Sequence, residues 1–249
     1  LPVDPEGIVD RAAAREAIDD TTAIVAAMAV NNEIGVIQPL DELAALAHDA
    51  GALFFCDAVQ GYGRVPLPQE ADMIAVSAHK VHGPKGIGAL WLREGVEIPP
   101  LLHGGGQEQG LRSGTLSPAL CAGFGTAAKL MRERAEEDAA HVEALWKTAR
   151  EAFSGWTLNG SAARRYHGNL NIRVDGLDVA RLMSDVRGVL FSAGSACASG
   201  SGRPSHVLAA LGLADAQIKS SIRLGFGRYS TAKELKAAAD LINRAAEAQ

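Results

Sequence analysis

Residues 71–80 have the sequence ADMIAVSAHK, in which a short apolar run is followed at once by polar residues. An apolar run of this length, bounded by turn-forming residues, is typical of a strand that is buried in a sheet. A turn that contains Gly and Pro comes next, and a further apolar run starts at Gly88. The stretch therefore predicts a strand whose end carries Ser77, His79 and Lys80.

Similar apolar runs occur on both sides of this stretch. We expect strands over residues 22–30, 52–56, 71–76 and 88–92, and a helix over residues 41–50. Strands that alternate with helices favour a parallel sheet. The first half of the chain is therefore predicted to be α/β with a mostly parallel sheet. In such open sheets, ligands bind beyond the carboxyl ends of the strands, which is where the polar residues gather.

The second half of the chain has a different pattern. Residues 117–153 are helical in pattern, and the charged segment 132–138 suits a solvated helix face. Beyond it we expect strands over 169–174, 189–192 and 220–225, and helices over 179–186, 205–211 and from 231 to the C-terminus. We place the domain boundary near residue 135. Residues 1–134 are then part of a large α/β domain, and residues 135–249 form a smaller α+β domain.

Composition and charge exclude several classes of protein. The chain has 249 residues, of which 47% are hydrophobic and 21% are charged, and its formal net charge is −5. No stripe of Lys and Arg suits a nucleic-acid backbone, and no apolar run approaches the roughly 18 to 20 residues of a membrane span. The N-terminus lacks the pattern of a signal peptide. We expect a cytoplasmic protein that binds neither nucleic acid nor membrane.

The three cysteines are Cys56, Cys121 and Cys197. They are widely spaced and odd in number, which indicates neither a disulfide framework nor a metal site. We expect Cys56, in a strand, and Cys121, in a helix, to be small buried core residues.

Asp57 and Lys80 follow two neighbouring predicted strands. A carboxylate and an amine are the two groups that a pyridoxal phosphate site needs, because the amine binds the cofactor covalently and the carboxylate keeps its pyridine nitrogen protonated. A single surface lysine is usually only solvated, and Asp57 could instead cap a helix. Their joint position at strand ends favours the cofactor-binding hypothesis.

Other polar residues near the strand ends could complete such a site. Gln60 and Asn32 could hydrogen-bond the ring hydroxyl of the cofactor, or could simply organise turns. Ser77 and His79 could donate to its phosphate, although a lone histidine is more often structural.

A glycine-rich segment, HGGGQEQGLRSGT, occupies residues 103–115. Its five glycines permit positive φ or close backbone approach, which is weak evidence alone. Arg112 and Thr115 add side chains that could bind an anion.

Six motifs, in order along the chain, resemble those of class I cysteine desulfurases: VNNEIGVIQP, DAVQ, SAHKVHGPKGIGALWLR, HGGGQEQGLRSGT, SAGSACASG and SSIRLGFGR. These are pyridoxal phosphate enzymes of fold type I, in the class-V aminotransferase superfamily. They take sulfur from L-cysteine, leave L-alanine and pass the sulfur to iron–sulfur cluster assembly or thiolation. The resemblance extends over about residues 1 to 245, and it implies the PLP-dependent transferase fold.

The resemblance also implies a role for each matching residue. Lys80 binds the cofactor covalently, and Asp57 contacts its pyridinium nitrogen. Ser77 and His79 bind the phosphate, and Thr115 reaches the phosphate in the other subunit of a homodimer. Gln60 and Asn32 lie near the ring hydroxyl or the substrate carboxylate, and Arg223 holds that carboxylate. An arginine fork suits this last task because it binds a carboxylate through two hydrogen bonds.

Cys197 lies within SAGSACASGSG, residues 192–202. By the resemblance it is the nucleophile that takes the sulfur as a persulfide, and it could transiently bind an iron–sulfur cluster; no other metal site is expected. A segment rich in Gly and Ser would let the thiol travel from the cofactor to an acceptor. The implied partners are L-cysteine, a second copy of the chain, and an iron–sulfur scaffold or another sulfur-acceptor protein.

The chain departs from the family pattern at its start. Members carry roughly another third of chain before the point that corresponds to Leu1, including a phosphate-binding turn and a histidine that stacks on the cofactor. We therefore expect an incomplete desulfurase that lacks the N-terminal third. Three alternatives stay open: a selenocysteine lyase, an aminotransferase of the same superfamily, and a truncated or degenerate non-catalytic paralogue that binds a sulfur-acceptor partner.

Overall fold

The computed structural model describes residues 1–193 and 204–249. Contacts within the chain divide it into two compact units. The unit that we call the α/β unit comprises Ile18–Ala29 and Leu40–Ala135. The α+β unit comprises Leu1–Ala17, Val30–Pro39 and Glu136–Gln249. The predicted domain boundary near residue 135 stays a prediction.

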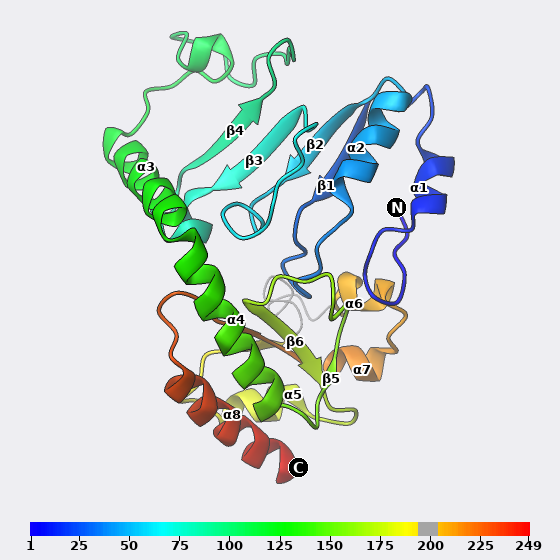
Figure 1. Ribbon diagram of the computed structural model, residues 1–249, viewed down its shortest axis with the longest axis vertical. Helices are drawn as coiled ribbons and strands as arrows, with labels where there is room; N and C mark the ends of the chain where they lie inside the picture. Colours follow the sequence, from blue (N-terminus) through cyan, green and yellow to red (C-terminus); the bar gives the residue numbers. More distant parts are fainter. Residues whose placement is uncertain (194–203) are drawn as a thin grey trace. The chain divides into compact units, whose positions relative to one another are not determined.

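The α/β unit is built on a four-stranded sheet with the strand order β1-β2-β3-β4 (Figure 1). Its strands are β1 (Ile24–Met28), β2 (Leu53–Asp57), β3 (Met73–Ser77) and β4 (Gly88–Leu92). The first three strands run parallel, and β4 pairs antiparallel with β3. The sheet is therefore mostly parallel, as predicted.

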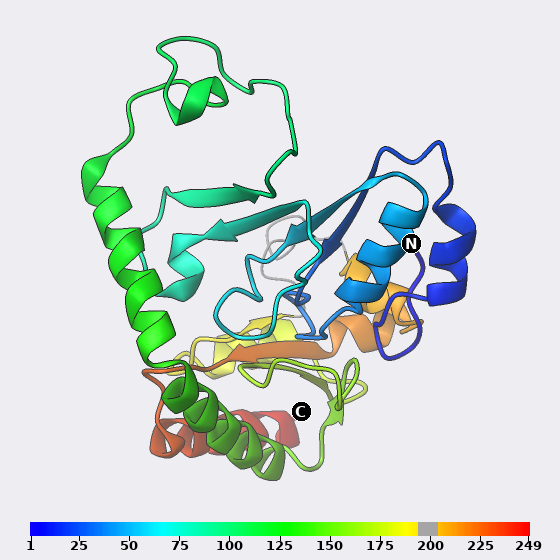
Figure 2. The ribbon, with the colours of Figure 1, turned by 45° about the horizontal axis from the view of Figure 1, so that its top comes forward.

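Helix α2 (Leu40–Asp49) connects β1 to β2 and packs on both strands (Figure 2). Its buried residues Leu43 and Ala47 recur at helical spacing and form an apolar face. Val25 of β1 and Phe54 of β2, which are neighbours in register, are also buried. This packing fixes the strands whose carboxyl ends carry the candidate residues.

After β3 the chain enters the short 3₁₀ turn η1 (Ala78–Val81), which ends at His82 with φ 66°. Beyond β4, the glycine-rich segment contains the 3₁₀ turn η2 (Glu108–Gly110), and four of its five glycines have positive φ: Gly104, Gly106, Gly110 and Gly114. Glycine tolerates this conformation because it has no Cβ.

Helix α3 (Pro118–Glu133) follows the glycine-rich segment and begins at its N-cap Ser117, whose hydroxyl accepts a hydrogen bond from Leu120 N. The expectation that Cys121 is buried is wrong, because this residue is exposed. Among the residues of α3 only Ala127 is buried, so Cys121 lies on a part of the helix that packs against little.

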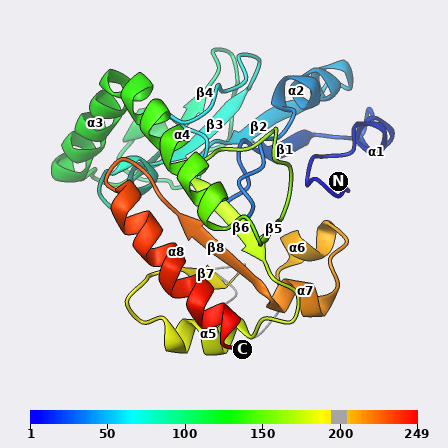
Figure 3. The same cartoon turned by 60° about the horizontal axis from the view of Figure 1, so that its bottom comes forward.

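The α+β unit has an antiparallel sheet with the order β5-β6-β8-β7 (Figure 3). Its strands are β5 (Thr157–Leu158), β6 (Asn169–Arg173), β7 (Ser192–Ala193) and β8 (Ser221–Gly225). Alternation along β6 and β8 places Leu170, Ile172 and Ile222 in the core. Their polar neighbours, among them Asn171 and Arg223, lie on the opposite face.

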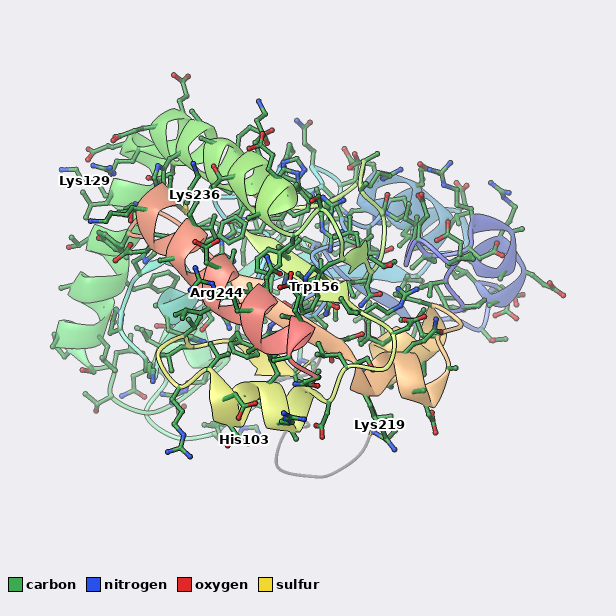
Figure 4. The ribbon with its side chains drawn as sticks, turned by 90° about the horizontal axis from the view of Figure 1, so that it is seen from below. His103, Lys129, Trp156, Lys219, Lys236 and Arg244 are labelled. Carbon is green, nitrogen blue, oxygen red and sulfur yellow. The ribbon has the colours of Figure 1, made fainter. Side chains whose placement is uncertain are left out.

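Three helices of this unit contribute to its core: α4 (Ala135–Ala152), α5 (Val179–Asp185) and α8 (Ala232–Glu247). A capping box starts α8, with Thr231 Oγ1 accepting from Glu234 N and donating to Glu234 Oε2. Trp156 Nε1 donates to Asn243 Oδ1 of α8 at 2.8 Å, and Figure 4 shows Trp156 beside this helix.

The remaining helices are short: α1 (Arg11–Ala17), α6 (His206–Ala210) and α7 (Asp215–Lys219). Side chains of α6 and α7 form a second apolar cluster with Ile34 and Val36. The strand expected over 189–192 is wrong in its extent, because only Ser192–Ala193 pairs with β8. Leu190 is 99% exposed, so the apolar pattern there does not mark a buried strand. Within the described ranges, no helix is long and apolar enough to cross a bilayer.

Candidate active site

Two neighbouring parallel strands of the α/β unit end in candidate residues. Asp57 is the last residue of β2 and lies opposite Ala75 of β3. Ser77 ends β3 two residues later, and Lys80 follows in η1. Parallel strands have their carboxyl ends at the same edge of the sheet, so the carboxylate and the amine-bearing turn share one edge.

The backbone and side chain of Asp57 are both held. Its carbonyl oxygen accepts from Ala29 N at 2.8 Å, and its Oδ1 accepts from Val59 N at 3.0 Å. A carboxylate has about four lone-pair sites, so this contact leaves acceptor capacity for a protonated ring nitrogen. Asp57 thus sits in a fixed orientation at the strand end and can still bind a cation.

Cys56 is fully buried beside Asp57, as expected for a core residue. Burial, with a smaller contribution from the charge of Asp57, raises the pKa of the Cys56 thiol to about 12. Since only the thiolate is nucleophilic, Cys56 is inert at neutral pH.

Arg64 links two candidates and is a residue that the sequence pattern did not single out. Its Nη1 donates to Gln60 Oε1 at 2.8 Å, and its Nη2 donates to the carbonyl oxygen of Lys80 at 2.6 Å. The only signal in the sequence is the four-residue spacing from Gln60, which suits two side chains on one helical turn. The arginine therefore ties the turn after β2 to the turn that carries the lysine.

Ser77 and His79, the two candidate phosphate ligands, hydrogen-bond to each other. Ser77 Oγ lies 2.7 Å from His79 Nδ1. Ser77 is half-buried, whereas His79 is exposed. When the hydroxyl donates to Nδ1, the imidazole carries its proton on Nε2, which is then a donor for an anion.

In the α+β unit, Arg223 and Asn32 lie in contact. Arg223 Nη1 donates to the carbonyl oxygen of Asn32 at 2.9 Å, and Asn169 Nδ2 donates to the same oxygen at 3.1 Å. A guanidinium has five N–H donors, so Arg223 keeps donors for a substrate carboxylate. The two residues predicted to bind substrate are thus brought together within this unit.

Thr115 is not joined to these groups. Thr115 is exposed, in the segment between Arg112 and Ser117. Within residues 1–193 and 204–249, the hydrogen bonds that link the other candidates do not include it. Cys197 lies outside the described residues.

The donor set of the α/β unit fits pyridoxal phosphate. It offers an amine for covalent attachment, a carboxylate for the pyridine nitrogen, and a paired hydroxyl and imidazole for a phosphate. The fold and these groups define the class of PLP-dependent transferases of fold type I. The chain belongs to the class-V aminotransferase family, whose model matches residues 1–238.

Similar proteins of known sequence and structure agree with this class. "Cysteine desulfurase IscS" of Rickettsia bellii is 42% identical over 251 residues, which cover 97% of this chain and 61% of that protein. The mitochondrial cysteine desulfurase of Saccharomyces cerevisiae is 45% identical over 243 residues, covering 94% of this chain and 49% of that protein. A solved structure of a NifS-like protein, 30% identical, superposes with a TM-score of 0.90 over 100% of this chain and 68% of its own. The predicted fold class is confirmed, and the chain spans less than two thirds of these two curated relatives.

Proposed function

We propose that the protein is a PLP-dependent cysteine desulfurase, which removes sulfur from L-cysteine to give L-alanine and a persulfide on Cys197. The observation that carries the proposal is the position of Asp57 and Lys80 at the ends of neighbouring parallel strands, with Arg64 holding the lysine turn. The names of the relatives support cysteine as the substrate.

Each described candidate has a task in this proposal. Bound PLP supplies an electron sink for bonds broken next to the amine carbon of the substrate. Lys80 holds the cofactor covalently and moves protons with its amine, and Asp57 keeps the pyridine nitrogen protonated. Ser77 and His79 bind the phosphate with their donors, and Gln60 contacts the ring hydroxyl.

Arg223 and Asn32 bind the carboxylate of cysteine. Their contact fixes the guanidinium relative to the loop that carries Asn32, so the substrate meets a preformed group. A bidentate arginine–carboxylate pair also orients what it binds, which matters because the sulfur must face Cys197.

The sulfur transfer follows from the chemistry of a thiolate. The Cys197 thiolate attacks the sulfur of cysteine, so that a new S–S bond forms while the Cβ–S bond breaks. The electron pair left on Cβ takes a proton, which completes alanine. The persulfide then passes its terminal sulfur to a thiol-bearing acceptor, for iron–sulfur cluster assembly or thiolation.

We further propose a homodimer in which Thr115 reaches the phosphate bound in the other subunit. The exposure of Thr115 in its own chain supports this role. A sulfur-acceptor protein would be the second partner, and the cytoplasm remains our expected location.

The test uses purified full-length protein loaded with PLP. Borohydride reduction should attach the cofactor to the peptide that contains Lys80, as found by mass spectrometry, and cysteine should yield alanine and sulfide in equal amounts under reducing conditions. The Cys197→Ser variant should retain the reduced adduct on Lys80 and lose sulfide release. Normal sulfide release by that variant, or an adduct that does not map to Lys80, would overturn the proposal.

A further inference from the structure

Two asparagines on the polar face of β6 hold the loop that carries Asn32. Asn169 Nδ2 donates to the carbonyl oxygen of Asn32 at 3.1 Å, and Asn171 Nδ2 donates to that of Glu33 at 3.0 Å. The Glu33 carboxylate in turn accepts from Ser205 Oγ, the N-cap hydroxyl of α6. The loop is therefore fixed at successive residues within the α+β unit.

The two asparagines differ in what shares their acceptor. Arg223 Nη1 donates to the carbonyl oxygen of Asn32 at 2.9 Å, so this oxygen accepts from Arg223 and Asn169 together. In the antiparallel register, however, Arg223 lies directly opposite Asn171, and Asn169 lies opposite Gly225. The arginine thus shares an oxygen with its diagonal neighbour on β6 and not with its direct one.

The shared oxygen limits how Arg223 can use its donors. A carbonyl oxygen has two lone pairs, and the donors from Asn169 and Arg223 fill both. The remaining N–H groups of the guanidinium stay available for a carboxylate, which an arginine fork binds through two parallel hydrogen bonds. Without the Asn169 donor, a second N–H of Arg223 could turn to the Asn32 oxygen and would be lost to the substrate.

The amide of Asn169 donates to Asn32 at a cost to its own oxygen. Asn169 Oδ1 is buried and has no hydrogen-bond partner among the described residues. The reverse orientation of the amide would place Oδ1 against the Asn32 carbonyl oxygen, so that two acceptors would face each other. Buried polar atoms are nearly always satisfied, so an unsatisfied one indicates that the position serves a purpose other than stability.

We propose that Asn169 is a positioning residue for substrate binding, which occupies one lone pair of the Asn32 carbonyl oxygen and so keeps the Arg223 fork directed at the carboxylate of cysteine. This role rests on the proposed function, in which Arg223 binds that carboxylate. Asn169 therefore contributes to the KM for cysteine and little to the free energy of unfolding.

Asn171 provides the matched control on the same face of the same strand. It is fully buried, and both ends of its amide are satisfied, because Oδ1 accepts from Asn159 Nδ2 at 2.8 Å while Nδ2 donates to Glu33. Asn171→Ala breaks both hydrogen bonds inside the core of the unit, so it should lower the urea midpoint of PLP-free protein. Asn169→Ala removes one hydrogen bond, whose acceptor keeps Arg223, and also removes an unsatisfied oxygen. Its midpoint should therefore equal or exceed that of wild type.

The kinetic comparison uses the full-length protein with PLP bound. Asn169→Ala should raise the KM for cysteine about fivefold with kcat within about twofold, which is the size expected for the loss of one hydrogen bond. Asn171→Ala should leave the KM within about twofold of wild type, because its acceptor is not shared with Arg223. Asn169→Asp keeps the shape of the side chain but places a carboxylate beside the guanidinium. Since this carboxylate competes with that of the substrate, the KM should rise at least about twentyfold.

A binding measurement isolates the carboxylate without any turnover. L-Alanine and ethylamine differ only in that ethylamine lacks the carboxylate, and the absorbance of bound PLP reports the binding of either amine. Asn169→Ala should raise the dissociation constant of L-alanine about fivefold and leave that of ethylamine unchanged. Asn171→Ala should change neither.

Each outcome bears on one of the two proposals. A wild-type KM in Asn169→Ala, or an equal rise of the KM in Asn169→Ala and Asn171→Ala, would overturn the role of the shared oxygen. An Asn169→Ala protein that fails to fold, or whose urea midpoint falls as far as that of Asn171→Ala, would show that Asn169 is structural and would also overturn it. A wild-type protein that binds L-alanine but releases no sulfide from cysteine would overturn the desulfurase assignment, and the comparison of L-alanine with ethylamine would then decide the role of Asn169.

Discussion

The guanidinium of Arg64 is bound to the carbonyl oxygen of Lys80, with 2.6 Å between Nη2 and O. The other end of the same fork reaches Gln60 Oε1 at 2.8 Å. Because η1 is a short turn with few hydrogen bonds of its own, this contact restrains the backbone from which the Lys80 amine extends. Arg64, to which we assign no contact with substrate or cofactor, thus fixes the position of the Lys80 backbone.

Replacement of Arg64 should disturb the attachment of the cofactor. Arg64→Ala removes donors to two acceptors, so we expect the PLP dissociation constant to rise by about tenfold, which corresponds to roughly 1.4 kcal/mol, and less PLP to be retained after dialysis. Arg64→Lys keeps the charge but cannot form the same fork, and it should retain PLP at an intermediate level. The visible absorbance of bound PLP measures both effects. Full retention in Arg64→Ala would contradict the role of this contact.

Ser77 and His79 should contribute to phosphate binding as a pair. Ser77→Ala removes a hydroxyl donor and the partner of His79 Nδ1, so we expect the PLP dissociation constant to rise about tenfold. His79→Gln should have a similar effect, and the double variant should be less impaired than the sum of the two. Titration of the apoprotein with PLP and, in parallel, with pyridoxal, which lacks the phosphate, checks this. An equal loss of affinity for both compounds would contradict phosphate binding.

Asp72 should stabilise the α/β unit from the opposite end of β3. Its carboxylate is 4% exposed and accepts from Phe54 N at 2.6 Å, from His48 Nε2 at 2.8 Å and from Arg93. Asp72→Ala removes the buried acceptor that these three donors share, so we expect the free energy of unfolding to fall by about 3 kcal/mol. Urea denaturation measures the change, and Asp20→Ala, at an exposed position, serves as the control.

The carboxylate of Asp72 should also make the free energy of unfolding depend on pH. Burial acts to raise the pKa of Asp72, but the hydrogen bonds from Phe54, His48 and Arg93 outweigh it and lower the pKa below its ordinary value of 3.8. A carboxyl whose pKa is lower in the folded state stabilises the fold above its unfolded pKa, and this contribution is lost as the pH falls through the folded pKa. We therefore expect the unfolding free energy to fall below about pH 4 by less in Asp72→Ala than in wild type. An equal fall in the unfolding free energy of the two proteins as the pH is lowered would contradict this expectation.

Local patterns in the sequence were sufficient to predict the strand ends. The apolar runs before Asp57 and Ser77 predict β2 and β3 as successive strands of one mostly parallel sheet, so the edge that carries Asp57 and Lys80 follows from patterning. The antiparallel direction of β4 was not assigned, because an apolar run is the same in either direction.

Side-chain partners could not be predicted in the same way. Glu33 and Ser205 are 172 residues apart, and nothing near either residue indicates the other, because the contact arises only when β6, β8 and α6 pack. The exposure of Cys121 likewise depends on which elements cover α3, and helical periodicity does not show this. The role of Cys197 came from the motifs alone, whereas that of Lys80 also came from its position after a predicted strand, and both roles stay predictions.

The methyl group that Gly35→Ala adds should disturb substrate binding. The φ of Gly35 is 73°, and a Cβ placed there would lie 3.0 Å from Cβ of Asn169, whose amide binds the carbonyl oxygen of Asn32. Gly51 has a similar φ of 77°, but no atom lies within 4 Å of a Cβ at that position. Gly51→Ala therefore measures the cost of the backbone conformation alone, about 1 kcal/mol of unfolding free energy. Gly35→Ala should cost about 2 to 3 kcal/mol, because displacement of Asn169 adds to that strain. Gly35→Ala should also raise the KM for cysteine several-fold while the absorbance of bound PLP stays unchanged. If Gly35→Ala and Gly51→Ala changed stability and KM equally, Asn169 would not transmit the effect of the added methyl group to the substrate-binding loop.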